Sequence, residues 1–349
     1  KSMAGLIAIS AITSIGLAGG VRVRQVVMSS APTHAVPTVA VVGSINADVY
    51  VEVPRIPAAG ETLAATGDSA ILPGGKGANQ AAAAARLGAR SRMIGQVGAN
   101  DDYGPQMLGH AQACGVDTAL VARHEAAQTG QAIILLQPSG ENSIIFIGGA
   151  NQDWPMAEAI TKEACAAIRE SSCLLLQREI PEHVNAYAAR AATAAQVPVI
   201  LDAGGVDAPL DEEMLRLCTC VSPNETELAR LSKMPTDTDD EVIAAAQALR
   251  KAGVDTVLVK LGSRGCVLVS GDGEPLWQPA FAVDNVVDTT GAGDCFTAAY
   301  AVAISEGMPP SDALRFASAA ASITIQSKGA MTSLPPREAV DALLARTAP

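Results

Sequence analysis

Short runs of valine, isoleucine and leucine alternate with alanine-rich stretches along most of the chain. The apolar runs occupy residues 132–136, 173–176, 197–201, 256–259 and 266–269, and alanine-rich helical stretches include 181–195 and 239–252. Strands that alternate with helices predict a parallel sheet with helices on both faces. No linker or repeat divides the chain after its first 38 residues, so we expect one doubly wound α/β domain over residues 39–349.

Two further segments, 48–53 and 141–146, alternate between apolar and polar residues. Alternation is typical of strands that are covered on one face only. The residues by themselves leave two placements open: a small separate β layer, or edge strands of the main sheet.

A glycine-rich motif, Val287-Asp288-Thr289-Thr290-Gly291-Ala292-Gly293-Asp294-Cys295-Phe296, precedes a segment of helical character, 296–304. Backbone N–H groups at the start of a helix favour an anion, and Asp294 lies beside them. Phosphoryl transfer to a hydroxyl needs such an anion cradle next to a base. The structural alternative is a tight turn with Asp294 as the N-cap. Phe296 occupies the place of the third glycine of a dinucleotide fingerprint, which argues against that motif.

A second glycine motif, Pro73-Gly74-Gly75-Lys76-Gly77-Ala78-Asn79-Gln80, leads into an alanine-rich stretch. Gly77 stands where a P-loop would place a magnesium-binding Ser or Thr, so the likeness to a P-loop is superficial. The glycines allow close approach of a ligand, and Lys76 and Asn79 offer donors to hydroxyls or phosphate. A plain helix entry with a solvated lysine is the alternative.

A third motif, Val39-Ala40-Val41-Val42-Gly43-Ser44-Ile45-Asn46-Ala47-Asp48, predicts a buried strand that ends at Gly43. Ligands of open α/β sheets bind at the carboxyl ends of the strands. Asn46 and Asp48 are therefore positioned to bind a polyol, unless they only form an Asx-rich turn.

Together the three motifs resemble the ribokinase family of sugar kinases, a group that includes fructokinases and adenosine kinases. Further matching strings begin at residues 176, 222, 261 and 328. The strings at 43–48 and 74–80 point to the ribokinase branch, and those at 177–181 and 259–262 to its plant form. The resemblance implies a ribokinase-like doubly wound sheet with a small β lid. We expect the lid to come from segments near 48–72 and 131–147, to cover the sugar and to form a homodimer contact.

The resemblance also implies an activity: ATP-dependent phosphorylation of D-ribose at its 5-hydroxyl, giving ribose 5-phosphate and ADP. A kinase for another sugar or a nucleoside, fructokinase-like or adenosine kinase-like, is the alternative, and a non-enzymatic scaffold is a third hypothesis. Asp294 would be the catalytic base, worth roughly 10²–10⁴ in rate. The N–H groups of Gly291, Ala292 and Gly293 would form the anion hole for the transferred phosphoryl group.

The ligand-binding residues are carried over from the resemblance. The sugar site would consist of Asn46, Asp48, Gly75, Lys76, Gly77, Asn79, Glu179 and Asp294. The ATP site would consist of Asn224, Glu227, Lys260, Gly262, Ser263, Gly265 and Gly293. Mg²⁺ would bridge the phosphates, with Asn224 and Glu227 acting through waters. The same two residues also fit a capping box at the start of a helix over 225–231.

Ribokinases also use a monovalent cation, usually K⁺. The matching positions are Asp288, Thr290, Thr324, Ser327, Gly329 and Ser333. The sequence departs from the bacterial pattern at two places. Asp202-Ala203-Gly204-Gly205, expected to be a loop, replaces an Asn-Pro string, and the role of this loop stays open. Lys260, beside the expected nucleotide, replaces a threonine. Lys260 could contact phosphate or be solvated.

Composition excludes several classes of function. A net charge of -12 argues against nucleic acid, which requires clustered Lys and Arg, and only 3% of the residues are aromatic. The seven cysteines are scattered without C-x-x-C spacing, which argues against a disulfide framework or a zinc site. We expect buried thiols in a reducing compartment.

Residues 1–38 contain no Asp or Glu, and they carry five serines, Arg22 and Arg24 around an apolar run. This composition favours an organelle transit peptide over a secretory signal or a membrane anchor, in a leader whose true start lies upstream of Lys1. With the plant-like strings, it predicts a plastid (chloroplast stroma) location, with the cytoplasm or mitochondria as alternatives, and no membrane attachment in the mature protein.

Overall fold

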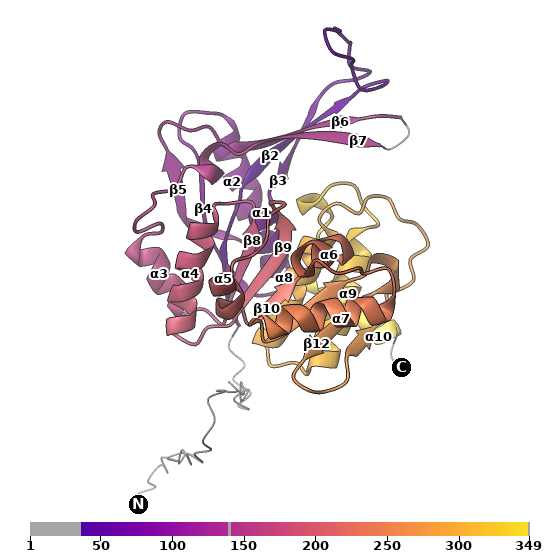
Figure 1. The fold of residues 1–349 in the computed structure, drawn as a ribbon. Coiled ribbons are helices and arrows are strands. Elements are labelled where there is room, and N and C mark those ends of the chain that lie inside the picture. The colour runs from indigo at the N-terminus through magenta and orange to yellow at the C-terminus, as the bar shows by residue number, and fades with distance from the viewer. Residues whose placement is uncertain (1–35, 139–140, 348–349) are drawn as a thin grey trace, which may run out of the picture. The chain divides into compact units, whose positions relative to one another are not determined.

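The fold is built on a mainly parallel sheet, and the computed structural model describes residues 36–138 and 141–347. The nine strands follow the order β13-β12-β11-β10-β9-β8-β1-β4-β5 (Figure 1). Neighbouring strands are parallel from β11 to β5, whereas β12 and β13 are antiparallel additions at one edge. The strands are β1 (Thr38–Val42), β4 (Arg90–Gly98), β5 (Asp117–His124), β8 (Cys173–Arg178), β9 (Val199–Gly205), β10 (Cys220–Ser222), β11 (Thr256–Lys260), β12 (Cys266–Ser270) and β13 (Leu276–Gln278).

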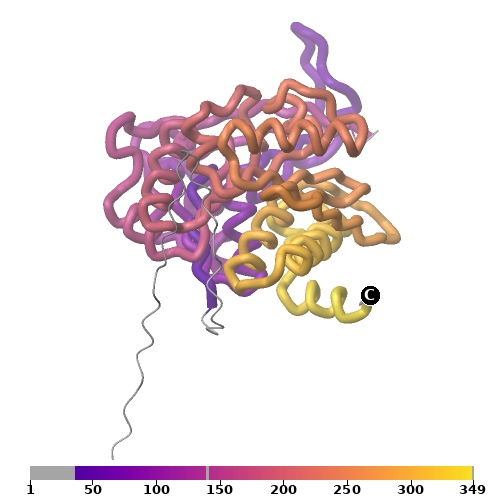
Figure 2. Tube along the Cα trace, turned by 60° about the horizontal axis from the view of Figure 1, so that its bottom comes forward, coloured from indigo at the N-terminus to yellow at the C-terminus, as the bar shows by residue number. Residues whose placement is uncertain are grey.

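Ten α-helices of the described chain cover the two faces of this sheet. One face carries α1 (Lys76–Arg86), α2 (Tyr103–Ala113), α8 (Ala292–Ser305), α9 (Pro310–Thr324) and α10 (Arg337–Arg346). The other carries α3 (Lys162–Arg169), α4 (Glu182–Ala194), α5 (Glu212–Leu217), α6 (Glu225–Ser232) and α7 (Asp239–Lys251). Figure 2 shows the carboxyl-terminal half of these two layers, with orange helices on one side and yellow helices on the other.

The sheet is buried on both faces because successive side chains of its strands point in opposite directions. Val39 and Val41 of β1 belong to one core cluster, and Ala40 and Val42 belong to the other. The predicted helices at 181–195 and 239–252 correspond to α4 and α7. The expected doubly wound α/β fold is confirmed.

A second, smaller sheet has the order β3-β2-β6-β7 and lies at the top of Figure 1. Its strands are β2 (Asn46–Glu52), β3 (Ala70–Gly74), β6 (Gly130–Leu136) and β7 (Asn142–Ile147). The β2–β6 pair is parallel and the other two pairs are antiparallel. The expected small β layer is therefore present, and the alternative of edge strands in the main sheet is wrong. The apolar run 132–136 also belongs here and not to the parallel sheet, because it pairs with β2 and β7.

The expected leader lies almost entirely in residues 1–35, outside the described residues, and β1 begins at Thr38. No helix in the described part of the chain is long and apolar enough to cross a membrane. All seven cysteines are free thiols; six are buried and Cys114 is partly exposed.

Candidate active site

Asp294 lies in the first turn of α8, which begins at Ala292, four residues earlier than the sequence predicted. Gly291 is the N-cap and adopts a φ of 79°, so the alternative in which Asp294 caps the helix is wrong. Asp294 is only 4% exposed. A carboxylate inside the first turn of a helix lies near the positive end of the helix dipole.

Three side chains from the first turns of α1 surround the Asp294 carboxylate. Asn79 Nδ2 donates to Oδ2 at 2.9 Å, and Gln80 Nε2 donates to Oδ1 at 3.4 Å. Lys76 Nζ lies 3.7 Å from Oδ1. Burial raises the pKa of Asp294 above its ordinary value, and the nearby lysine opposes that effect. Such a carboxyl group binds a proton more readily than an exposed aspartate, as a general base should.

The two glycines of the cradle are required for different reasons. A β-carbon at Gly291 would lie 2.8 Å from Ala330 Cα, so Gly291 is needed for the packing of the fold. A β-carbon at Gly293 would meet only Lys260, at 3.6 Å from Nζ, so the fold itself leaves room there. The Ala292 N–H already donates to Thr289 O at 3.2 Å. The open space above Gly293 is therefore available to a ligand.

A cavity of about 770 Å³ lies between the small sheet and the start of α8. Of the predicted sugar residues it is lined by Asn46, Asp48, Gly75, Lys76, Asn79, Glu179 and Asp294. Gly77 does not line it; its close approach to the backbone of Ser44 leaves no space for a side chain, with a β-carbon 2.6 Å from Ser44 N. The role of Gly77 is thus to let α1 pack against the end of β1.

Glu179 follows β8 directly and is held in place by the loop after β1. Glu179 Oε2 accepts from Ser44 Oγ at 2.6 Å and from the Lys76 N–H at 2.9 Å. Ser44 Oγ accepts in turn from the Gly77 N–H at 3.3 Å. These bonds fix the carboxylate at the rim of the cavity.

Asn151 is a buried residue of this site that the sequence analysis missed. It lies in a 3₁₀ turn, Gly149–Gln152, and its Nδ2 donates to Asn46 Oδ1 at 2.8 Å. Its amide also bonds the Ile45 N–H and carbonyl, at 3.0 and 3.1 Å. Because Asn46 Oδ1 accepts the hydrogen bond from Asn151, the Asn46 amide NH₂ remains to donate into the cavity. The string Gly149-Ala150-Asn151, which repeats the composition of Gly77-Ala78-Asn79, was the available signal.

The cavity also gathers acidic groups. Burial raises the pKa of Asp48 to about 7, and the charges of Glu179 and Asp294 add to that effect. Asn79 Oδ1 is buried and has no partner within the described protein. Unsatisfied acceptors of this kind are costly unless a ligand supplies a donor. The cavity therefore fits a ligand with several hydroxyl groups.

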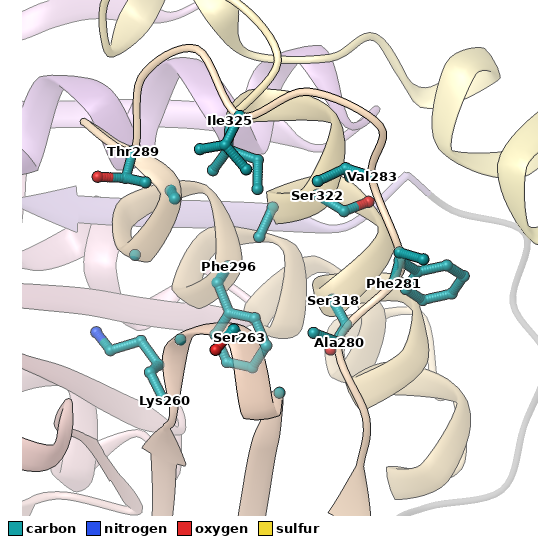
Figure 3. Close-up of a pocket in the computed structure, with 17 residues that line it drawn as sticks. Lys260, Ser263, Ala280, Phe281, Val283, Thr289, Phe296, Ser318, Ser322 and Ile325 are labelled. Atoms are coloured by element: carbon teal, nitrogen blue, oxygen red, sulfur yellow. The ribbon is translucent and has the colours of Figure 1, made fainter.

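A second cavity, of about 730 Å³, lies on the other side of the α8 start (Figure 3). Of the predicted ATP residues, Lys260, Gly262, Ser263, Gly265 and Gly293 line it. Most of its other residues are apolar, among them Phe281, Val283, Val286, Phe296 and Ile325. Figure 3 shows Lys260 and Phe281 at opposite ends of the cavity. A flat apolar ring system with a charged tail would match this distribution.

Asn224 and Glu227 do not line the apolar cavity but a third hollow of about 430 Å³, together with Lys76, Lys260 and Asp294. They form the capping box of α6, with two hydrogen bonds of 2.8 Å between them. The capping role is therefore confirmed, and both residues face the hollow that joins the two larger cavities.

Among the expected cation-binding residues, Asp288 joins two loops, whereas others form hydrogen bonds within their own turns. Asp288 accepts from the Thr290 N–H at 2.9 Å and from the Gly329 N–H at 2.8 Å, so it holds two loops together. Burial raises the pKa of Asp288, but these hydrogen bonds outweigh it and leave the pKa below its usual range. The side chains of Thr324 and Ser333 bond within their own turns, to the carbonyls of Ala320 and Ala330. The Ser327 N–H bonds the carbonyl of Thr324.

Comparison with known proteins identifies the family. Residues 36–337 match the family described as pfkB family carbohydrate kinase. This chain belongs to that family. It is 46% identical to a ribokinase of Arabidopsis thaliana over 90% of this chain and 83% of the relative, and 38% identical to a ribokinase of Haemophilus influenzae over 86% and 96%. The resemblance found in the sequence is thus confirmed.

Solved structures of the pfkB family agree with the fold. The structure described as Arabidopsis thaliana ribokinase complexed with ribose and ATP superposes with a TM-score of 0.85 at 45% identity, covering 89% of this chain and 99% of the other. The crystal structure of ribokinase from Thermotoga maritima gives a TM-score of 0.78 at 36% identity, covering 88% of this chain and 99% of the other.

The two departures from the bacterial family pattern meet each other in the structure. Residues 202–205 do not form a loop but complete β9, and Asp202 pairs with Lys260 at 2.6 Å. This contact could not be derived from the motifs, because the two residues lie on strands that are not adjacent in the sheet.

Proposed function

We propose that this protein transfers the γ-phosphoryl group of ATP to the 5-hydroxyl of D-ribose, giving ribose 5-phosphate and ADP. The observation that carries the proposal is the position of Asp294, a buried carboxylate between a polar cavity and the open start of α8. The similarity to the Arabidopsis enzyme, whose structure is described as a complex with ribose and ATP, supports both substrates.

In the mechanism, the Asp294 carboxylate accepts the proton of the attacking hydroxyl. The hydroxyl oxygen forms a bond to the γ-phosphorus while the bond from that phosphorus to the ADP oxygen breaks. The N–H groups of Gly291 and Gly293, and the α8 dipole, stabilise the phosphoryl oxygens as charge develops. Lys76, 3.7 Å from Asp294, lies where it can balance that charge. Ala292 contributes less than expected, because its N–H already has a partner.

Ribose recognition would rest on hydrogen bonds from both sides of the cavity. Asn46 would donate through its free NH₂, and Asn79 Oδ1 would accept from a sugar hydroxyl. Asp48 and Glu179 supply further acceptors for paired hydroxyls. Gly75, with a φ of 85°, lets the backbone pass against Ile45 and Asn46, where a side chain has no room.

Mg²⁺ fits the hollow between the cavities as an ion bound chiefly by phosphate and water. Within the described residues no group of three or more His, Cys, Asp or Glu side chains is arranged to hold a metal. Mg²⁺ keeps several waters and needs only one or two protein carboxylates. Glu227 and Asn224 would hold such waters, and the ion would neutralise phosphate charge during transfer.

A monovalent cation fits beside the cradle at the two loops that Asp288 joins. Gly291 packs on Ala330, so these loops support the start of α8 directly. K⁺ bound by oxygens of Asp288, Thr290, Thr324, Ser327, Gly329 and Ser333 would favour the loop conformation that positions the anion hole. Only Asp288 among them is charged, which suits a weakly held monovalent ion.

The deciding experiment measures ADP release by the full-length protein with D-ribose, D-fructose and adenosine as acceptors, in potassium and in sodium buffer. We expect turnover with ribose that rises with potassium. Turnover with fructose or adenosine only would keep the base and cradle but replace the acceptor. No turnover with any acceptor would favour the scaffold hypothesis.

We further propose a homodimer formed through the small sheet. β7 is an edge strand, and Ile145 and Ile147 are 55% and 40% exposed. Ile144 and Phe146 alternate with them and line the sugar cavity. A long apolar edge strand is a site for pairing with another chain. Sedimentation of the protein and of Ile145→Lys tests this, with a monomeric variant as the expected result.

A plastid location is the last part of the proposal. It rests on the composition of the leader and on the similarity to a plant relative. A fluorescent fusion of the leader, expressed in leaf cells, should accumulate in chloroplasts; accumulation in the cytosol or mitochondria would contradict it.

A further inference from the structure

Asp202 and Lys260 form an ion pair across the carboxyl end of the main sheet. Lys260 Nζ lies 2.6 Å from Asp202 Oδ2. β10 lies between their strands, so the two side chains together bridge two strand spacings, about 10 Å. Asp202 also accepts from Thr297 Oγ1 at 2.8 Å and from the Gly204 N–H at 2.9 Å. The carboxylate is therefore fixed by α8 and by its own strand, and it in turn fixes the lysine.

The pair is nearly withdrawn from water. Asp202 is 1% exposed and the Lys260 side chain 14%. A buried ion pair adds little to stability, because the cost of removing both charges from water offsets their attraction. β9 and β11 are each hydrogen-bonded to β10, so the sheet does not need this pair to hold them. The reason for the pair must therefore lie in what surrounds it.

Lys260 stands where the apolar cavity meets the hollow next to Asp294, and it lines both. Its ammonium group lies over the start of α8, 3.6 Å from the position of a β-carbon on Gly293. A nucleotide with its base in the apolar cavity and its last phosphate at Asp294 must pass this ammonium group. The Lys260 ammonium group therefore lies on the path that the phosphates would take.

The charged residues that line this hollow include the two lysines, Lys76 and Lys260, and the two aspartates, Asp202 and Asp294; Glu225 and Glu227 line its rim beside them. Burial favours the neutral form of Asp202, but Lys260 and Lys76 outweigh it and lower the pKa of Asp202. Asp202 thus stays ionised and balances the two lysines before a nucleotide enters. Without Lys260, Asp202 would lose its direct partner, and Lys76 would be left to offset both Asp202 and Asp294 beside the phosphates.

We propose that Asp202 is a positioning residue that holds Lys260 over the start of α8, where Lys260 binds the terminal phosphates of the nucleotide. The inference rests on the proposed function in one respect, since it assumes a nucleoside triphosphate in the cleft. The two departures from the bacterial pattern then act together. Lys260 supplies the positive charge, and Asp202 holds the lysine in position and balances its charge.

A double-mutant cycle on the full-length protein tests the proposal, using Asp202→Asn, Lys260→Thr and the double variant. Calorimetry measures the binding of ATP and of adenosine to each. Lys260→Thr should weaken ATP binding at least about 30-fold and leave adenosine binding within about twofold. Asp202→Asn should have a smaller effect, because the lysine keeps its charge. The double variant should bind ATP at least about tenfold better than Lys260→Thr, since no unpaired buried carboxylate remains.

The exposed pair Arg190–Glu213, with a distance of 2.7 Å, is the matched control. Arg190→Met and Glu213→Gln should leave the binding of both ligands unchanged, singly and together. Additive effects of the Asp202 and Lys260 substitutions, or equal losses for ATP and adenosine, would overturn the inference. Wild-type protein that binds ATP but phosphorylates no acceptor would contradict the proposed function instead, and the binding cycle would still test the pair.

Discussion

The two large cavities of the cleft are built on opposite principles. The sugar-side cavity is lined by carboxylates and amides that already bond to one another, as in Asn46 with Asn151 and Asn79 with Asp294. The nucleotide-side cavity is walled mainly by apolar side chains such as Phe281 and Ile325. The first cavity offers hydrogen bonds of fixed direction to its proposed ligand, and the second offers apolar contact area.

This difference predicts how each side tolerates change. A site built to bond hydroxyls rejects a ligand or a variant that leaves its polar groups unpaired, because each unpaired group is costly. An apolar wall loses only the contact area of the atoms removed. Substitutions on the polar side and at the cradle should therefore have large effects, and those on the apolar wall small ones.

The largest effect should come from Asp294→Asn. The asparagine keeps the size of the side chain but cannot accept the hydroxyl proton, so kcat should fall by about 10²–10⁴. The KM values for both substrates should change by much less, because binding does not need the proton transfer. Steady-state kinetics with ribose as the acceptor, and a melting curve to confirm folding, check this. Retention of more than a tenth of the wild-type kcat would remove Asp294 from the role of base.

The two cradle glycines should separate stability from catalysis. Gly293→Ala places a methyl group in open space of the free protein and favours a helix, so the free energy of unfolding should hold or rise. The same methyl group obstructs the phosphoryl group, and kcat should fall by about 10²-fold. Urea unfolding and kinetics on the same preparation measure both.

Gly291→Ala is the matched variant. Here the φ of 79° and the contact with Ala330 make any side chain costly, so the free energy of unfolding should drop by about 2 kcal/mol or more. Equal stability losses in the two variants would contradict the distinction between a glycine kept for the fold and one kept for the ligand.

The same contrast shows what could be predicted from the sequence. The parallel strands and the helices α4 and α7 followed from periodicity, because a long amphipathic or apolar run has few ways to be buried. The start of α8 was placed four residues late, because Gly291, Ala292 and Gly293 give no amphipathic signal. The small sheet was left open, since alternation does not say which sheet a strand joins.

The partners that hold the ligand-facing residues could not be predicted from the sequence. Asp202 and Lys260 are separated by 58 positions, and Asn46 and Asn151 by 105. The motifs supplied the residues that face the ligands, and the fold supplied the partners that hold them. Asn151 and Asp202 are such partners, and both act through a neighbour that the motifs had already marked.

Asn151→Ala tests the preorganised side of the comparison. Loss of this amide frees Asn46 to rotate and leaves the Ile45 N–H without its partner, so the KM for ribose should rise about 10- to 100-fold. The KM for ATP should stay within about twofold, because the apolar cavity does not involve Asn151. Ala150→Gly, at the neighbouring position, is the control. Equal changes in both KM values would indicate general loosening of the cleft.

The pH dependence of ribose binding should also be confined to the polar side. With a pKa of about 7, Asp48 is mostly neutral at pH 6 and mostly ionised at pH 8. If the ionised form accepts the sugar hydroxyls, the KM for ribose should fall about tenfold between these pH values. Asp48→Asn should abolish this slope and leave the KM for ATP unaffected. A slope that persists in the variant would assign it to another group.

The raised pKa of Asp48 has an opposite consequence for stability. The folded protein binds the proton more tightly than the unfolded chain, so this group destabilises the fold as the pH rises from about 4 through 7. The melting temperature of Asp48→Asn should therefore rise relative to that of the wild type over that range. Bound ribose should narrow the gap, since its hydroxyls compensate the carboxylate.

Ile325→Ala should give the smallest effect and so mark the other end of the comparison. The substitution removes three carbons from the wall, of which a ligand would cover part, and about 1 kcal/mol of binding corresponds to a fivefold rise in the KM for ATP. The Ile325 carbonyl accepts from the Val287 and Asp288 N–H groups through the backbone, so the loop of the proposed cation site should survive the change. Activation by potassium and the KM for ribose should then match the wild type. A loss of potassium activation would show that the apolar wall and the loops joined by Asp288 are coupled. That result would contradict the division of the cleft into a hydrogen-bonding side and an apolar side.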